Sequence, residues 1–453
     1  MARRSARLSC SLLLAFGSIA AGCGDDAHPA HAGAVQIHPV PGCESIDPTP
    51  CDVFDTACET RLMDLAACLR GSAAQPLPPV SRMTEAEYAQ WLTDQIAAEK
   101  PPPNVNNVEA AFVMLGLVVQ GAFQPSSMAM VDASQVWGVY RSDTDDVLLI
   151  DHGVPGDAAQ VNAVLLHEFV HALQDHDQDL PTWFDAHADT YDATLATKSV
   201  VEGEARFHED RFAVSLLGLD PATVDLAKHF DNAILHDEEW MRMQPSPYLA
   251  SFYALPYDFG ARRLLPRFTQ NGPQAIADLF ATPTADTRVL LDPTNDAVIP
   301  AWAAPSAPTP PAEWTLVEES TLGAWMVDLV LGEDGLTADA DVQARGWRGD
   351  RFWIYAGTGA SATATAMVWR IAFADEATAL LAATRLSLKF VTQRFGAEVV
   401  IAAADPRTLL DWAFVAPAQN AASPGDDQRA FAEAASVSDW VARIFIRAER
   451  RGR

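Results

Sequence analysis

The segment 167–171 reads H-E-x-x-H and constrains the fold more than any other feature of the chain. Apolar residues recur at helical spacing from residue 161 onward, which predicts a helix that begins at Asp157 and carries both histidines. Residues four apart lie one above the other on a helix, so the imidazoles of His167 and His171 can reach one metal ion. Glu168 projects at the edge of that face, where its carboxylate can accept a proton from water. The segment therefore predicts a partly buried helix that carries a metal site.

Two acidic residues are candidates for the third ligand of this metal. Asp177 stands where the metzincin pattern H-E-x-x-H-x-x-G-x-x-H/D places a ligand, but Gln174 occupies the position of the glycine that turns the chain. Glu202 lies on the next predicted helix, Phe184 to Leu217, and a carboxylate from a second helix completes a His₂Glu site with one position open for water. Glu202 is therefore favoured, and the donor set predicts one Zn²⁺ per chain, which lowers the pKa of its water to about 7.

Further segments of the chain resemble the aminopeptidase N-type gluzincins. Glu202-Gly203-Glu204-Ala205 resembles their E-G-x-A segment, whose Glu is the third zinc ligand, and Tyr257-Asp258-Phe259-Gly260-Ala261 resembles their Y-x-x-G-A segment, whose Tyr stabilises the tetrahedral intermediate. A closer resemblance, over about residues 80–450, is to bacterial secreted proteins with HExxHALQD, VEG[DE]A, PYxxG and GWxGD motifs, the last of which reads Gly346-Trp347-Arg348-Gly349-Asp350 here. The resemblance implies a gluzincin-like fold, with Glu202 on zinc and Tyr257 facing the oxyanion.

The same resemblance implies a zinc-dependent hydrolase that acts on a peptide or protein substrate. His167, His171 and Glu202 would hold zinc, Glu168 would be general base and proton shuttle, and Tyr257 would donate a hydrogen bond to the oxyanion. The Gly-rich exopeptidase signature of aminopeptidase N is absent ahead of the zinc helix, which favours an endopeptidase. The alternative is a binding lipoprotein without turnover, with or without zinc, and the intact Glu168 speaks against it.

The sequence also gives expectations for other polar residues near the H-E-x-x-H segment and for two further elements. Metal-bound histidines usually donate their second N–H to a partner, and the candidates for it are Asp185, Asp189 and Asp192. Because Glu204 cannot share a helix face with Glu202, we expect it to be solvated, together with His176, His187 and His208; a hydrogen bond from a ligand histidine to Glu204 is the alternative. We also expect a helix over Thr84–Glu99 and a β-hairpin over Gln135–Ile150, whose outer strand either pairs with an extended peptide or lies in the core.

The N-terminus has the pattern of an export signal. Three arginines within residues 1–7 precede about ten apolar residues, which is too short a run to span a bilayer. Ala20-Ala21-Gly22-Cys23 resembles a bacterial lipobox, which implies cleavage before Cys23 and acylation of its thiol and amine. Ordinary signal-peptidase cleavage is the alternative. We therefore expect an exported bacterial lipoprotein of the cell envelope, held at the membrane only by its lipid anchor.

Four further cysteines, Cys43, Cys51, Cys58 and Cys68, lie close together in the chain. An even number of clustered cysteines in an exported chain predicts two disulfides, and the sequence leaves all three pairings open. A zinc knuckle is the alternative, but no two of these cysteines have the C-x-x-C spacing of such sites. Helical spacing of Leu62, Leu65 and Leu69 predicts a small disulfide-bonded helical module.

Composition limits the partners and the fold class. The 453 residues include 31 Lys and Arg against 60 Asp and Glu, a formal net charge of −29, which argues against nucleic-acid binding and against electrostatic docking on anionic lipid. Nothing in the sequence indicates the oligomeric state. We expect a mainly α-helical α+β protein with a hairpin-bearing catalytic domain and a smaller α+β domain. The predicted segments are a signal peptide (1–22), a tether (23–42), a Cys-rich module (43–75), a zinc hydrolase domain (76–299), a Pro-rich linker (300–312) and a C-terminal domain (313–453).

Overall fold

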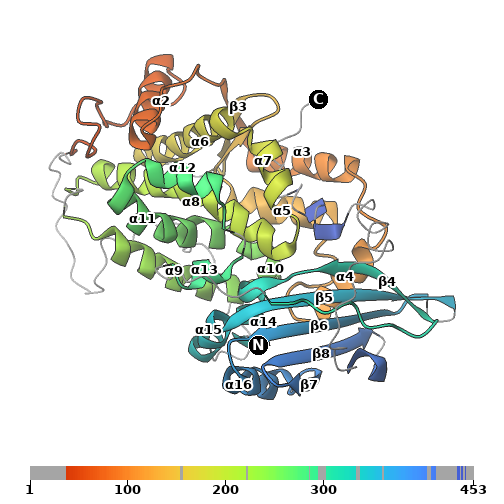
Figure 1. Ribbon diagram of the computed structural model, residues 1–453. Coiled ribbons are helices and arrows are strands. Elements are labelled where there is room, and N and C mark those ends of the chain that lie inside the picture. Colours follow the sequence, from red (N-terminus) through yellow and green to blue (C-terminus); the bar gives the residue numbers. More distant parts are fainter. Residues whose placement is uncertain are drawn as a thin grey trace, which may run out of the picture.

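The computed structural model describes residues 37–444 except for 154–156, 221–222, 285, 294–301, 333–336, 360–361, 406–409, 415–435, 439 and 442–443. The predicted signal peptide, Cys23 and most of the predicted tether lie outside the described residues. Within them, the mainly helical α+β class is confirmed: helices form one part of the molecule and a five-stranded sheet the other (Figure 1). None of the described helices is long and apolar enough to span a bilayer.

The N-terminal module is built around one helix and two disulfides. Helix α2 (Thr56–Arg70) begins at Asp55, whose side chain accepts from the backbone N–H of Ala57, and ends at Gly71, where a φ of 72° suits glycine. Disulfides join Cys43 to Cys68 and Cys51 to Cys58, so both predicted disulfides are confirmed and the pairing is now known. The buried face of α2 packs against α6 (Ala158–Gln178).

A three-stranded sheet packs against α6. It consists of β1 (Val80–Thr84), β2 (Gly138–Arg141) and β3 (Asp146–Asp151), in the order β1-β3-β2. β2 and β3 are antiparallel, so the predicted hairpin is confirmed, and β2 is an edge strand. β1 runs parallel to β3 and leads directly into α3 (Glu85–Ala98), so the helix expected over Thr84–Glu99 is confirmed, and Thr84 caps it.

Helix α8 (Tyr191–Leu216) lies beside α6 (Figure 1), and further helices complete the first part of the molecule. They are α4 (Val105–Met114), α5 (Pro125–Gln135), α7 (Leu180–His187), α9 (Leu226–Met243), α10 (Pro247–Ser251), the π-helix η1 (Leu255–Phe259), α11 (Gly260–Asn271), α12 (Gln274–Ala281) and α13 (Arg288–Leu291). The single helix predicted from Phe184 to Leu217 is wrong, because α7 ends at His187 and Thr190 caps a new helix by accepting from Ala193.

The C-terminal part is an antiparallel sheet with helices packed on it. Its elements are β4 (Trp314–Ser320), α14 (Gly323–Gly332), α15 (Thr337–Arg345), β5 (Trp347–Gly357), β6 (Thr365–Phe373), α16 (Glu376–Leu386), β7 (Val391–Phe395), β8 (Glu398–Asp405) and the 3₁₀-helix η3 (Asp411–Phe414), with strand order β4-β5-β6-β8-β7. The G-W-x-G-D segment begins β5, with Trp347 as its first residue. The Asp350 carboxylate accepts from the backbone of Leu322 and Gly323 and from the indoles of Trp347 and Trp369, so it joins β5, β6 and the start of α14.

One apolar core runs through both parts. Phe112 of α4 and Tyr248 of α10 belong to the same buried cluster as Trp325 of α14 and Phe352 and Trp369 of the sheet. Residues 302–312 of the Pro-rich segment contact the sheet; for example, the Tyr355 hydroxyl donates to the carbonyl of Pro308. The predicted division into domains at 300–312 stays a prediction, and the two flanking segments share buried apolar surface.

Candidate metal centre

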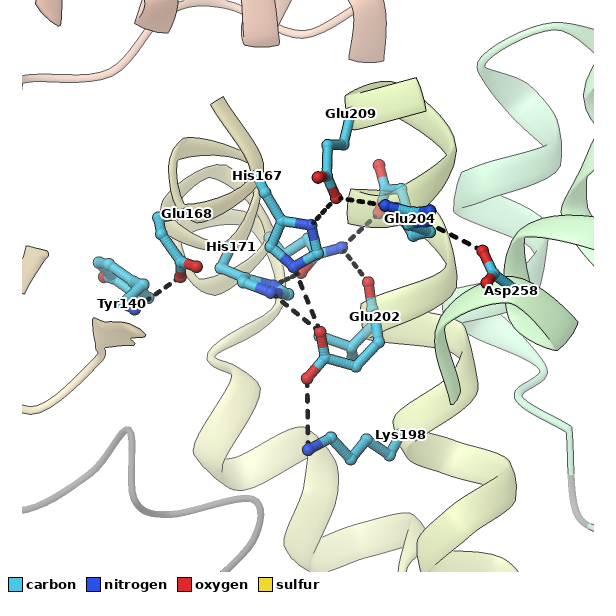
Figure 2. Close-up of polar contacts among 12 residues, drawn as sticks. Tyr140, His167, Glu168, His171, Lys198, Glu202, Glu204, Glu209 and Asp258 are labelled. Atoms are coloured by element: carbon cyan, nitrogen blue, oxygen red, sulfur yellow. Dashed lines mark hydrogen bonds and ion pairs between the residues drawn. The ribbon is translucent and has the colours of Figure 1, made fainter. Parts of the chain in front are cut away.

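Three predicted ligands converge between α6 and α8. His167, His171 and Glu202 each offer a ligand atom, and these atoms lie within 4.8 Å of one another. Oε2 of Glu202 is 3.4 Å from Nε2 of His167 and 3.3 Å from Nε2 of His171. Figure 2 draws both contacts. All three side chains are buried. The cluster could hold a metal ion.

Asp177, the other candidate for the third ligand, pairs with Arg70 instead. Asp177 lies near the end of α6, where its carboxylate accepts from the guanidinium of Arg70. It does not belong to the group of possible metal ligands found among the described residues. A continuous α6 explains this, because without a glycine at Gln174 the chain does not turn back toward the histidines. Of the two sequence candidates, Glu202 is the one that the fold brings to the cluster.

Both histidines use their Nδ1 atoms outside the cluster. Nδ1 of His167 lies 3.1 Å from Oε2 of Glu209, and Nδ1 of His171 lies 2.8 Å from Oε1 of Gln174. These contacts leave both Nε2 atoms turned toward Glu202 (Figure 2). Such partners orient the imidazoles of metal sites and fix their tautomers. The histidines are therefore arranged as metal ligands would be.

The partners predicted from sequence were different ones. Asp192 instead accepts from the backbone and hydroxyl of Thr287, and Asp185 and Asp189 are exposed. The signal for the observed partners was helical spacing: Gln174 follows His171 by three residues and Glu209 follows Glu202 by seven, which places each pair on one helix face.

Glu202 is held from two sides. Its Oε2 faces the histidines, and its Oε1 lies 3.4 Å from Nζ of Lys198, one turn earlier on α8. Burial raises the pKa of this carboxyl, but Lys198 and His171 outweigh burial and hold the pKa well below its ordinary value. Glu202 is thus ionised, with one oxygen directed at the cluster.

The charge around His167 also favours a cation. Burial alone would lower the pKa of His167, but its contacts with Glu202 and Glu209 outweigh burial and raise the pKa to about 10. The pKa of His171 is raised in the same way, against the effect of burial, chiefly by Glu202. A site that attracts a proton this strongly has a negative potential that a divalent cation would neutralise.

Glu168 lies on the side of α6 that faces β2. Its Oε2 accepts from the backbone N–H of Tyr140 at 2.8 Å, and only 5% of the residue is exposed (Figure 2). Burial raises the pKa of its carboxyl, while His167 and His171 oppose that shift. Gly138 lies so close that a Cβ there would be 2.7 Å from Oε1 of Glu168. A buried carboxylate whose pKa is raised beside the cluster suits a group that takes up and returns a proton.

Tyr257 comes to the cluster from η1. Its ring centroid is 5.9 Å from that of His167, the two rings are nearly parallel, and the residue is half-buried. The next residue, Asp258, accepts from Arg206, whose guanidinium also pairs with Glu209. Because Glu209 is the partner of His167, this ion-pair network links the Tyr257 segment to a ligand histidine.

Two side chains expected in solvent are buried. Glu204 is 2% exposed and accepts from Nε of Arg70 and from Nε2 of Gln174, because α8 has packed neighbours on all sides. His208 is fully buried, and burial, with Arg211 and Arg70 nearby, holds its pKa well below the ordinary value. His176 is exposed, as predicted, and His187 is half-buried.

Comparisons with other proteins return no relatives: no protein-family model matches the chain, and neither a curated protein nor a solved structure is matched.

Proposed function

We propose that this protein is a zinc-dependent hydrolase, acting as a metalloendopeptidase on a peptide or amide bond. The observation that carries the proposal is the convergence of His167, His171 and Glu202, with Glu168 buried beside them. The resemblance to gluzincins noted in the sequence supports the same conclusion through Glu202 and Tyr257.

The donor set fits zinc. Two imidazole nitrogens and one carboxylate oxygen are a known ligand set of catalytic Zn²⁺, and Gln174 and Glu209 hold both Nδ1 atoms away from the ion's position. When bound, zinc supplies a Lewis acid that polarises a carbonyl and makes water nucleophilic near pH 7. Lys198 would keep Glu202 oriented by holding the oxygen that faces away from the histidines.

The protein's own groups would move the proton and stabilise charge. Glu168 would take a proton from the attacking water and pass it to the nitrogen of the departing amine, while the Tyr140 N–H holds its Oε2 in place. Tyr257 would donate a hydrogen bond to the oxygen that gains negative charge, a contact that is stronger in the transition state than in the ground state.

An extended peptide is the substrate that the surroundings favour. β2 is an edge strand, and the amide of Tyr140 turns away from β3 toward Glu168. An added strand along this edge would lie beside the general base. The two disulfides are typical of an oxidising compartment, in keeping with export and with lipid attachment at Cys23.

The test is the isosteric variant Glu168→Gln. We expect it to retain about one zinc per chain and to lose cleavage of a peptide library by at least about 100-fold, because general-base catalysis contributes on that scale. Glu239→Gln, which changes an exposed glutamate on α9, is the matched control and should behave like wild type. Cleavage that survives in Glu168→Gln would contradict the mechanism. Purified wild type without bound metal would instead favour the binding-protein alternative.

A further inference from the structure

A chain of buried hydrogen bonds leads from the ligand His171 to the disulfide-bonded module. Nδ1 of His171 meets Oε1 of Gln174 at 2.8 Å, and Nε2 of Gln174 donates to Oε2 of Glu204 at 2.9 Å. The other oxygen of Glu204 accepts from Nε of Arg70 at 2.7 Å. The path thus starts on α6, crosses to α8 and ends on α2; part of it is drawn in Figure 2.

The direction of each hydrogen bond is fixed by chemistry. The amide nitrogen of Gln174 also donates to the carbonyl of Val201 at 2.9 Å, so both of its hydrogens face groups that only accept. Its oxygen must then face His171, which requires a hydrogen on Nδ1. In the neutral imidazole this leaves the lone pair on Nε2, the atom that faces Glu202.

Arg70 holds the far end of this path. It is 6% exposed and occupies the last turn of α2, two residues after the disulfide-bonded Cys68. Its guanidinium also donates to the carbonyl of Leu173 and to the carboxylate of Asp177, so one side chain is bound to both α6 and α8. Among the residues that the structure describes, the only other titratable group within ion-pair distance of Glu204 is the buried His208, at 3.8 Å.

We propose that Arg70 is a positioning residue for the metal ligand His171, acting through Glu204 and Gln174. The disulfide-bonded module is then part of the metal centre, because it supplies the cation that orients Glu204. Glu204 in turn fixes the Gln174 amide, and that amide selects the imidazole tautomer. This inference rests on the proposed zinc site, but it does not depend on which bond the protein cleaves.

The experiment measures zinc affinity by chelator competition, without any substrate. We expect Arg70→Met and Gln174→Met each to raise the zinc Kd by about 10–100-fold, the usual effect of losing a group that orients a ligand. Arg70→Lys, which keeps one positive charge, should fall between wild type and Arg70→Met. The matched control is Arg61→Met: Arg61 also lies on α2 and pairs with Asp47, so its zinc Kd should be that of wild type.

Two further readouts separate positioning from simple stability. If Arg70 and Gln174 act along one path, the double variant should bind zinc no more weakly than the poorer single variant. The ¹⁵N shifts of His171 in the zinc-loaded protein should show a protonated Nδ1 in wild type and lose that signature in Gln174→Met. A folded Arg70→Met with wild-type zinc Kd, or additive losses in the double variant, would overturn the proposal. Intact zinc binding without peptide cleavage would contradict the proposed function and leave this inference standing.

Discussion

At the scale of single residues, Gly138 determines where the carboxylate of Glu168 can lie. A Cβ at this position would be 2.7 Å from Oε1 of Glu168 and 2.8 Å from Cγ1 of Val164. Val164 on α6 must shift to relieve its part of the clash, and the Glu168 side chain must move as well. That movement would break the contact with the Tyr140 N–H.

Gly138→Ala should therefore lower activity without removing zinc. We expect kcat/KM for a cleaved peptide to fall about 10–100-fold, because a misplacement of about 1 Å can cost that much. The zinc content should stay near wild type, and the melting temperature should fall slightly because Val164 must also shift. Activity equal to wild type would show that Glu168 has another position available to it and would contradict the role of this contact.

The sequence predicted the three ligands, and the groups that hold them were largely missed. His167 and His171 could be paired because four residues make about one helical turn, which is a local rule. Which side of α8 meets α6 is a tertiary property, and it decides that Gln174 and Glu209 bind the histidines. The contact between Arg70 and Glu204 could not be predicted for the same reason, since the two residues are 134 positions apart in the sequence.

At the scale of elements, two glycines let the segments that carry Glu202 and Tyr257 touch. A Cβ on Gly203 would be 2.4 Å from the carbonyl carbon of Gly260, and a Cβ on Gly260 would be 2.2 Å from the carbonyl oxygen of Ser199. Glycine follows Glu202 directly and follows Tyr257 by three residues. α8 and the start of α11, which directly follows η1, therefore pack backbone to backbone beside the site.

Gly203→Ala should force these two elements apart. Backbone atoms cannot yield as a flexible side chain can, so we expect a loss of about 1–3 kcal/mol in the free energy of unfolding, together with weaker zinc binding. Urea unfolding and chelator competition on the same preparation check both effects. Unchanged stability and an unchanged zinc Kd would contradict the close backbone contact between Gly203 and Gly260.

Elements with strong local signals were predicted, and those that depend on distant partners were not. Asp157 caps α6 as expected, because a cap needs only the residues next to it. β1 was missed because its pairing partner β3 lies more than sixty residues further along the chain. The break between α7 and α8 was missed because helical periodicity continues across Thr190.

At the scale of the whole molecule, buried charges lie where the helical part meets α14. Asp328 of α14 is 1% exposed and accepts from Arg242 of α9. Burial raises the pKa of Asp328 to about 6, against the effect of Arg242. Burial and the nearby Asp328 raise the pKa of Glu238, also on α9, to about 7; Asp341 adds to this, while Arg242 and Arg345 oppose it. The stability of the contact between α9 and α14 therefore depends on pH.

The sign of that sensitivity follows from proton binding. Asp328 and Glu238 keep their protons to higher pH in the folded protein than in the unfolded chain, whose carboxyls ionise near pH 4. Between about pH 4 and pH 7 the folded state therefore binds more protons, and the contribution of these groups to stability falls as the pH rises. It is fully present only below the pKa values of the unfolded chain.

Glu238→Gln removes one of these groups and should flatten the pH dependence. We expect the variant to gain about 2 kcal/mol over wild type at pH 8, where Glu238 is ionised in wild type, and to gain little at pH 4.5. Urea unfolding at the two pH values measures the difference, and Glu239→Gln, a neighbouring exposed glutamate, is the control. An equal gain at both pH values, or the same gain in the control, would show that Glu238 acts through general charge repulsion. The contact between α9 and α14 would then have no part in the effect, because repulsion in a chain of net charge −29 acts on every carboxylate alike.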